Sequence, residues 1–280
     1  MTSYADPNVL VETQWVADHL DDPNVRLIEA AYDTENYDLG HISGALPWTW
    51  NQDFQHPVRK DVPDKEGWEA LLARSGITND TTVVVYGAPS KYYATYAVWL
   101  LTIYGHQDIR LMNGGREKWK AENRLLTTDV SAVTQTTYQA QEPDWSFRAL
   151  LDRVQGSIGN PNRVLVDVRE PEEYCGALSP TWELPFEGGQ RGGRIPGAVN
   201  ILWSKVLQND GTFKPVEALQ EIYTSQGVTA EKEAITYCVI GGRSSHTWFV
   251  LKYLLGYPQV RLYDGSWLEW GGLIGAPIER

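Results

Sequence analysis

The second half of this 280-residue chain repeats the first, and this internal repeat limits the possible folds more than any other feature. Residues 83–119 align without a gap on residues 234–270, so that Gly87 falls on Cys238. Upstream, GHISGA (40–45) matches GRIPGA (193–198), in the same order. Ordered self-similarity of this kind indicates two copies of one domain. Seven aligned pairs are identical: Tyr86/Tyr237, Leu100/Leu251, Gly105/Gly256, Arg110/Arg261, Leu111/Leu262, Gly114/Gly265 and Trp119/Trp270.

The repeat also suggests where the two copies begin and end. We expect a first domain over residues 1–130 and a second over 147–280. The polar, Thr/Gln-rich stretch SAVTQTTYQAQEPDWS (131–146) is the expected linker. The second copy carries an insertion around CGALSPTWELPFEGGQRG (175–192).

Short apolar stretches alternate with helical patterns inside the second copy. Strands separated by helices predict an α/β domain whose mainly parallel sheet is covered by helices on both faces. The predicted strands are 164–168, 198–201, 234–237 and 260–263. The predicted helices are the turn EPEEYCG, the segment VEALQEIYTSQG with Gly227 as its C-cap, and the long apolar SSHTWFVLKYLLGY.

Composition excludes several classes of partner. The net charge of −12 argues against nucleic acid and against an anionic membrane, because both are bound through excess Lys and Arg. No apolar stretch approaches the ~20 residues that span a bilayer, and MTSYADPNVL lacks a signal pattern, so we expect a cytoplasmic protein. The two cysteines build no disulfide framework and are not spaced as metal ligands. We expect neither a metal nor a cofactor.

The two copies differ most at the junction between a strand and the next helix, where the second copy reads CVIGGRS (238–244). Cys238 follows a predicted strand, where open α/β sheets bind ligands. Gly241 and Gly242 allow successive amides to point inward, and Arg243 adds a cation at the start of a helix. Such a loop can hold an anion and favours the reactive thiolate. The candidate substrate-binding residues are Val239, Ile240, Gly241, Gly242, Arg243 and Ser244, around the catalytic Cys238.

A lone cysteine is more often a small buried hydrophobe than a nucleophile. The combination of two glycines, an arginine and a helix start favours function at Cys238. Cys175 is expected to be a peripheral thiol, and His246 a surface or hydrogen-bonded residue of the following helix. The Trp119/Trp270 pair is expected in the two cores.

The whole chain resembles the tandem-domain thiosulfate sulfurtransferases, or rhodaneses, especially the bacterial ones. YCVIGGRSSHTWFVLKYLLGY, YDGSWLEWG and GAPIE are similar to the catalytic half of that family, and GHISGA and NGGREKW to its inactive half. The resemblance implies that Cys238 takes the outer sulfur of thiosulfate as a persulfide, releases sulfite, and passes the sulfur to cyanide or another thiophile. It also implies that Arg243 binds the donor, and that the protein is a monomer.

Four residues depart from the family pattern. Val239 stands where many members carry a basic or small residue, and Gly242 where bacterial relatives often carry Glu. Glu173 occupies the place of a substrate-binding arginine of the vertebrate enzymes. Arg194 replaces a common His and is expected on the surface. These departures leave the preferred sulfur donor open.

Three alternatives stay open. A cysteine phosphatase has five residues between its Cys and Arg, whereas Cys238 and Arg243 have four between them. A 3-mercaptopyruvate sulfurtransferase would share fold and nucleophile, but the loop of that class ends without an arginine. A non-catalytic sulfur carrier or interaction module is the third, and such modules usually lose the cysteine.

Overall fold

The computed structural model describes residues 3–88, 92–178 and 191–280. These residues form two compact units. The N-terminal unit contains Asn8–Asp144 and Leu207–Phe213. The C-terminal unit contains Met1–Pro7, Trp145–Val206 and Lys214–Arg280. Most of the predicted insertion at 175–192 lies outside the described residues.

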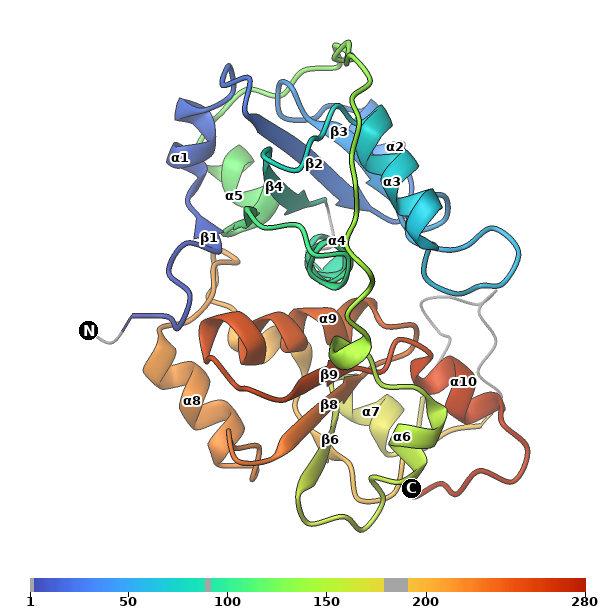
Figure 1. Ribbon diagram of the computed structural model, residues 1–280. Helices are drawn as coiled ribbons and strands as arrows, with labels where there is room; N and C mark the ends of the chain where they lie inside the picture. The colour runs from blue at the N-terminus through green and yellow to red at the C-terminus, as the bar shows by residue number, and fades with distance from the viewer. Residues whose placement is uncertain (1–2, 89–91, 179–190) are drawn as a thin grey trace. The chain divides into compact units, whose positions relative to one another are not determined.

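The N-terminal unit is built on a five-stranded parallel sheet (Figure 1), with strand order β1-β5-β4-β2-β3. One face of the sheet carries a core formed with the helices α1, α2 and α5, and α4 packs on β2, β4 and β5. The strands are β1 (Leu10–Val11), β2 (Val25–Ala31), β3 (Leu46–Thr49), β4 (Thr82–Gly87) and β5 (Ile109–Met112). The helices are α1 (Thr13–Asp18), α2 (Glu35–Asp38), α3 (Lys65–Arg74), α4 (Tyr92–Ile103) and α5 (Gly115–Ala121).

The C-terminal unit has a four-stranded parallel sheet of order β7-β6-β8-β9. The strands are β6 (Arg163–Asp167), β7 (Val199–Asn200), β8 (Glu233–Tyr237) and β9 (Val260–Leu262). The α-helices are α6 (Leu151–Gln155), α7 (Pro171–Tyr174), α8 (Val216–Thr224), α9 (Gly242–Phe249) and α10 (Ser266–Gly272). Two short 3-10 helices, η1 (Trp145–Phe147) and η2 (Trp203–Val206), complete the regular structure together with η3 (Val250–Leu254).

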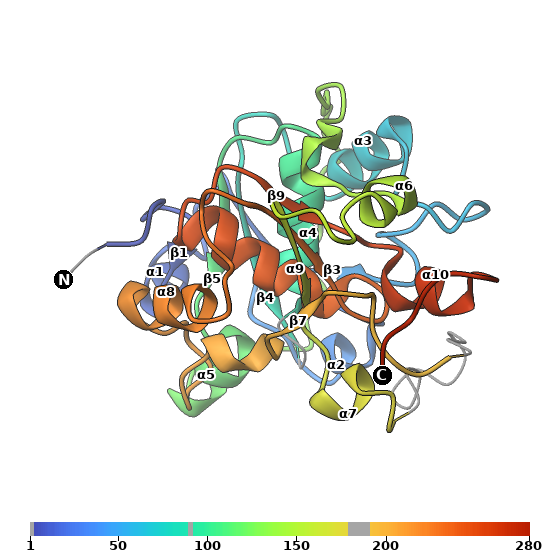
Figure 2. The same cartoon turned by 90° about the horizontal axis from the view of Figure 1, so that it is seen from below.

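All five residues of β8 are buried, as expected for an interior strand covered on both faces, although its sequence EAITY includes Glu233 and Thr236. Ile235 and Tyr237 belong to a core cluster that includes Trp270, and Trp119 has the same place in the core of the N-terminal unit. On the opposite face, α9 runs along β8 and β9 (Figures 1 and 2). The prediction of two α/β domains with parallel sheets covered by helices is therefore confirmed.

The long helix predicted over residues 244–257 has a change of geometry inside it. The α-helix α9 ends at Phe249, and Val250–Leu254 continue as a π-helix. The hydrogen bond from the Leu255 N–H to the Val250 carbonyl, 2.9 Å long, is the i→i+5 bond that defines this wider turn. Periodicity alone does not distinguish such a turn from a regular helix.

Residues 131–144 contain no helix or strand and belong to the N-terminal unit. Two short segments belong to the unit formed mainly by the other half of the sequence: Met1–Pro7 belongs to the C-terminal unit, and Leu207–Phe213 to the N-terminal unit. The amides of Ala5 and Asp6 donate to the carbonyls of Leu254 and Tyr253, at 2.9 and 3.0 Å. The Phe213 amide donates to Asn113 Oδ1 at 3.1 Å. These hydrogen bonds of main-chain amides help to explain why neither unit is one continuous stretch of sequence.

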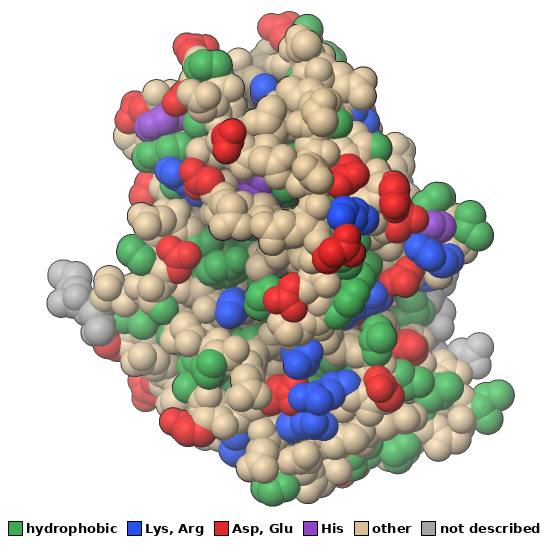
Figure 3. Space-filling model, in the orientation of Figure 1, with side chains coloured by type: hydrophobic (Ala, Val, Ile, Leu, Met, Phe, Trp, Pro, Cys, Tyr) green, Lys and Arg blue, Asp and Glu red, His purple; other side chains and the backbone are tan. Residues whose placement is uncertain are grey.

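The visible face of the space-filling view carries acidic side chains spread among basic and polar ones (Figure 3). No helix of the described residues is long and apolar enough to cross a membrane.

Candidate active site at the Cys238 loop

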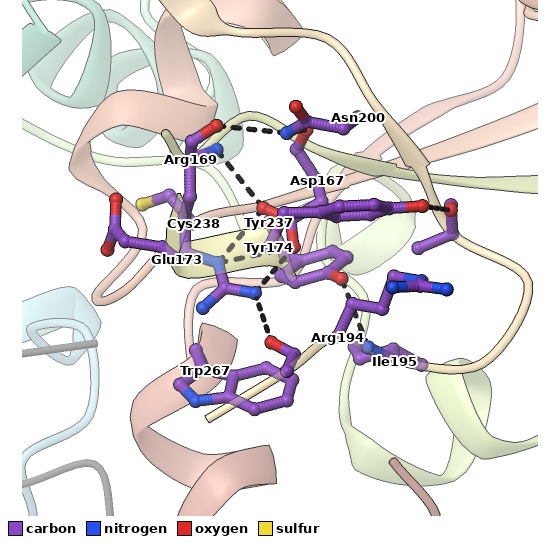
Figure 4. Close-up of polar contacts among 12 residues, drawn as sticks. Asp167, Arg169, Glu173, Tyr174, Arg194, Ile195, Asn200, Tyr237, Cys238 and Trp267 are labelled. Carbon is purple, nitrogen blue, oxygen red and sulfur yellow. Dashed lines mark hydrogen bonds and ion pairs between the residues drawn. The ribbon is translucent and has the colours of Figure 1, made fainter. Parts of the chain in front are cut away.

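Cys238 is the first residue after β8, an interior strand of the C-terminal sheet. Its thiol lies at the carboxyl end of the parallel strands, in the turn that leads into α9. The side chain is 1% exposed. In Figure 4 it lies beside Glu173 and Arg169. The loop therefore has the position in which α/β sheets bind ligands.

Two donors of the loop face the sulfur. The Gly241 N–H donates to Cys238 Sγ at 3.2 Å. The Ser244 hydroxyl lies 3.5 Å from the sulfur and 3.0 Å from the Gly241 carbonyl oxygen, so its one proton is shared between two acceptors. Gly241 has φ +97°, and a Cβ there would lie 3.1 Å from the Asp264 Cα. Glycine is thus required both by conformation and by space. The buried thiol is not enclosed by hydrocarbon alone, since an amide and a hydroxyl are directed at it.

The first turn of α10 holds the other side of the loop. The Cys238 N–H donates to Ser266 Oγ at 3.1 Å. The Trp267 and Leu268 amides donate to the carbonyls of Cys238 and Val239, at 3.1 and 3.0 Å. Amides at a helix start lack intrahelical partners, so the loop carbonyls satisfy them.

Arg243 does not stand alone as a cation. Its Nη1 and Nη2 donate to the two carboxylate oxygens of Glu173 at 2.9 and 3.1 Å, and both side chains are buried. Glu173 also accepts the Glu170 N–H at 3.1 Å as part of the capping box of α7. The sequence predicted one fixed positive charge in the loop, but the structure pairs that charge with a carboxylate 70 residues earlier in the chain.

A second buried ion pair lies at the end of β6. Arg169 binds Asp167 through Nε and Nη2, and Nη2 also donates to the Gly193 carbonyl at 2.7 Å. The guanidinium lies over the Trp267 ring, 4.4 Å from its centroid. Burial, together with the charge of Asp167, raises the pKa of Tyr237 well above its usual value. Figure 4 shows Arg169 between Asp167 and Trp267.

The N-terminal unit has an equivalent of this second pair. Glu29 pairs in register with Tyr86, as Asp167 does with Tyr237. The cation near Glu29 is Arg116 of α5, 3.7 Å from the carboxylate. In the sequence alignment of the two halves, Arg116 falls on Trp267 and not on Arg169. The two units therefore supply a guanidinium from different points of the chain.

The other candidate substrate-binding residues of the loop are buried: Val239, Ile240, Gly242 and Ser244. Among the other candidates, Cys175 is exposed. His246 is buried, and its ring meets Trp203 edge-on at 5.5 Å, so it is not a surface residue.

Arg194 is also not a simple surface residue. Its side chain is 19% exposed and stacks over the Tyr174 ring at 4.5 Å. The stacking explains how the position accommodates a long cation, because the guanidinium face covers an aromatic ring. In the N-terminal unit His41 stacks on Tyr37 in the same way, at 3.6 Å.

Sequence reasoning missed Asp167, Arg169 and Ser266, and assigned Glu173 no role. A signal for Ser266 was present, because it falls on Gly115 in the alignment of the two halves just as Cys238 falls on Gly87. The pairing of Glu173 with Arg243 depends on tertiary structure and has no local signal. The described residues hold no group of three or more side chains suited to a metal ion.

The fold and the site define an α/β protein with a cysteine loop at the carboxyl end of a parallel sheet. Comparison with known proteins identifies the family. The model of the Rhodanese-like domain matches residues 12–122 and 150–273. The chain therefore belongs to the rhodanese family, in a tandem-domain form.

Two curated relatives cover almost the whole chain. The sulfur carrier protein TtuD of Thermus thermophilus is 49% identical over 280 residues, covering 99% of this chain and 98% of the relative. A protein of Mycolicibacterium smegmatis named "Putative thiosulfate sulfurtransferase" is 48% identical over 272 residues, with 97% and 98% covered. Among solved structures, an EanB variant in a persulfide, tetrahedral intermediate state with ergothioneine has a TM-score of 0.88 and 25% identity. That match covers 100% of this chain and 72% of the other.

Proposed function

We propose that the protein is a thiosulfate sulfurtransferase that carries sulfur on Cys238. The observation that carries the proposal is the Gly241 N–H directed at Sγ, 3.2 Å away, in a turn that ends β8 and begins α9. An amide donor there stabilises negative charge on sulfur, first as the thiolate and then as the persulfide. The names of the relatives support the same chemistry.

The reaction has two displacements. The Cys238 thiolate attacks the outer sulfur of thiosulfate, the bond between the two donor sulfurs breaks, and sulfite leaves with the electron pair. A thiophilic acceptor, cyanide or a thiolate, then attacks the terminal sulfur of the persulfide. The bond to Sγ breaks, and the Cys238 thiolate is restored.

The loop also influences which donor is preferred. Because Glu173 neutralises Arg243, we propose that the donor oxyanion is held mainly by loop amides and the Ser244 hydroxyl. Arg243 still ends the loop with a guanidinium, which the loop of the alternative, a 3-mercaptopyruvate sulfurtransferase, lacks. Comparing thiosulfate with 3-mercaptopyruvate, using one acceptor, separates the two activities.

The intact mass of the protein after incubation with thiosulfate tests the proposal. The wild type should gain the mass of one sulfur atom, and Cys238→Ser should gain none. Cys175→Ser is the matched control, since it removes the exposed thiol and should still gain one sulfur. A gain that persists in Cys238→Ser, or no gain in the wild type, would overturn the proposal.

A sulfur carrier is the second candidate, favoured by the relative at 49% identity that has this name. A carrier would take up one sulfur and release it to a partner protein, without turning over with cyanide. Sulfite or thiocyanate released per molecule of protein decides between them. Many equivalents indicate an enzyme, and a single equivalent indicates a carrier.

A further inference from the structure

Ser266 has a backbone conformation that serine rarely adopts. Its φ is +52°, in the left-handed region, where a Cβ approaches the carbonyl oxygen that follows. The residue that aligns with it in the N-terminal unit is Gly115, with φ +63°. Both copies therefore make the same turn, but glycine makes it without a side chain. The strained residue, Ser266, therefore occurs in the copy that carries the cysteine.

The Ser266 hydroxyl both accepts and donates a hydrogen bond. It accepts the Cys238 N–H at 3.1 Å and donates to the Tyr263 carbonyl at 2.8 Å. The side chain is completely buried, so water does not replace these partners. One hydroxyl thus connects the residue after β8 with the residue after β9. Gly115 cannot make such a connection, because it has no hydroxyl.

The same turn fixes the orientation of the next two peptide groups. The carbonyls of Cys238 and Val239 point to the amides of Trp267 and Leu268. In a trans peptide the N–H points opposite to the C=O, so the N–H groups that follow these two carbonyls point away from α10. Together with the Gly241 N–H on Sγ, this arrangement determines which backbone dipoles surround the sulfur.

We infer that Ser266 is a positioning residue for the Cys238 nucleophile, and this inference rests on the proposed sulfur transfer. Its hydroxyl bonds to the main chain of Cys238 and of Tyr263, and not to Sγ. That bond orients the peptide from which Cβ and Sγ extend, so that the thiol stays under the Gly241 amide. Ser266 keeps its left-handed backbone because the hydroxyl performs this task.

The test uses the full chain in a Cys175→Ser background, so that Cys238 is the remaining thiol. Ser266→Gly removes the hydroxyl and relieves the backbone strain, whereas Ser266→Ala removes the hydroxyl and keeps the strain. Rapid mixing with thiosulfate gives the single-turnover rate of sulfite release and the half-saturating concentration. Urea unfolding gives the stability of each variant.

Both variants should lose at least tenfold in the rate at saturation, with the half-saturating concentration changed less than twofold. Ser266→Gly should remain at least as stable as Ser266→Ala. Gly115→Ser is the matched control, because it introduces the strained serine in the copy without a thiol. It should lower stability and leave the rate within twofold.

A Ser266→Gly protein that is folded and releases sulfite within twofold of the parent rate overturns the inference and leaves the proposed function intact. A parent protein that releases no sulfite at all removes the proposed function, and the positioning role with it.

Discussion

Two buried arginines lie near the thiol, and each is matched by a carboxylate: Arg243 by Glu173, and Arg169 by Asp167. A buried ion pair adds little net stability, but removing one partner leaves an uncompensated charge. Charge matching keeps the surroundings of the sulfur close to neutral. In the proposed reaction, the direct stabilisation of sulfur anions then falls mainly to the Gly241 amide.

At the residue scale, Glu173→Gln should separate the two effects of this pairing. The free energy of unfolding should fall by about 3 kcal/mol, because the Arg243 charge loses its buried partner. The half-saturating thiosulfate concentration should fall by about threefold, because an uncompensated guanidinium attracts the dianion. Urea unfolding and steady-state kinetics measure the two quantities.

Glu279→Gln is the control for this change. Glu279 pairs with Arg194 at 3.3 Å and is 46% exposed, so its loss should alter stability by less than about 1 kcal/mol. An unchanged or higher half-saturating concentration in Glu173→Gln would show that Arg243 does not face the donor.

At the scale of elements, local patterns predicted most of the C-terminal unit. The strand predicted at 234–237 is β8 (Glu233–Tyr237), and the helix predicted from VEALQEIYTSQG is α8 (Val216–Thr224). Gly227 was predicted as the C-cap of this helix, but the C-cap is Ser225, and Gly227 lies two residues beyond it with φ +73°. The π-turn at Val250–Leu254 was not predictable, because hydrophobic periodicity does not distinguish it from a regular helix. The contacts of α10 with the cysteine loop were not predictable, because they join residues distant in sequence.

The turn between β8 and α9 should tolerate no side chain at Gly241. Gly241→Ala introduces strain at φ +97° and places a Cβ 3.1 Å from backbone atoms of Asp264. We expect at least a tenfold slower persulfide formation and a loss of about 2 kcal/mol or more in stability. Sulfite release in a single turnover and urea unfolding measure these effects.

Gly197→Ala is the matched control within the same unit. It has a similar φ of +75°, but no atom lies within 4 Å of the added Cβ. It should cost about 1 kcal/mol of strain alone and leave the rate unchanged. Equal effects of the two substitutions on the rate would show that the close approach to Asp264 is unimportant.

At the scale of the whole molecule, the net charge of −12 opposes a dianionic donor. Salt reduces this repulsion, since the screening length shortens from about 30 Å at 0.01 M to about 8 Å at 0.15 M. The kcat/KM for thiosulfate should therefore rise about threefold over this range. Alkylation of Cys238 by uncharged iodoacetamide is the control and should not change. A fall in kcat/KM would reveal a local positive field that dominates the overall charge.

The repeat predicted two similar domains, but not how contacts are distributed between them. The sequence suggested a boundary between the domains at residues 131–146. In the structure the C-terminal unit includes Met1–Pro7 as well as the chain from Trp145 to Val206. The segment Leu207–Phe213 belongs to the other unit. The two short segments are held in the opposite unit by a few hydrogen bonds of main-chain amides, which neither composition nor periodicity predicts.

The different origin of the arginine in the two units has a consequence for engineering. The N-terminal copy takes its guanidinium from Arg116, at the start of its last helix, where the C-terminal copy has Trp267. Grafting CVIGGRS alone into the first copy would therefore place a cysteine against a charged side chain and a glycine, with no hydroxyl to hold it. A working transplant must also carry the first turn of α10 and the stretch from the end of β6 through Glu173 in α7, so the smallest portable unit of this chemistry comprises three separate segments of chain.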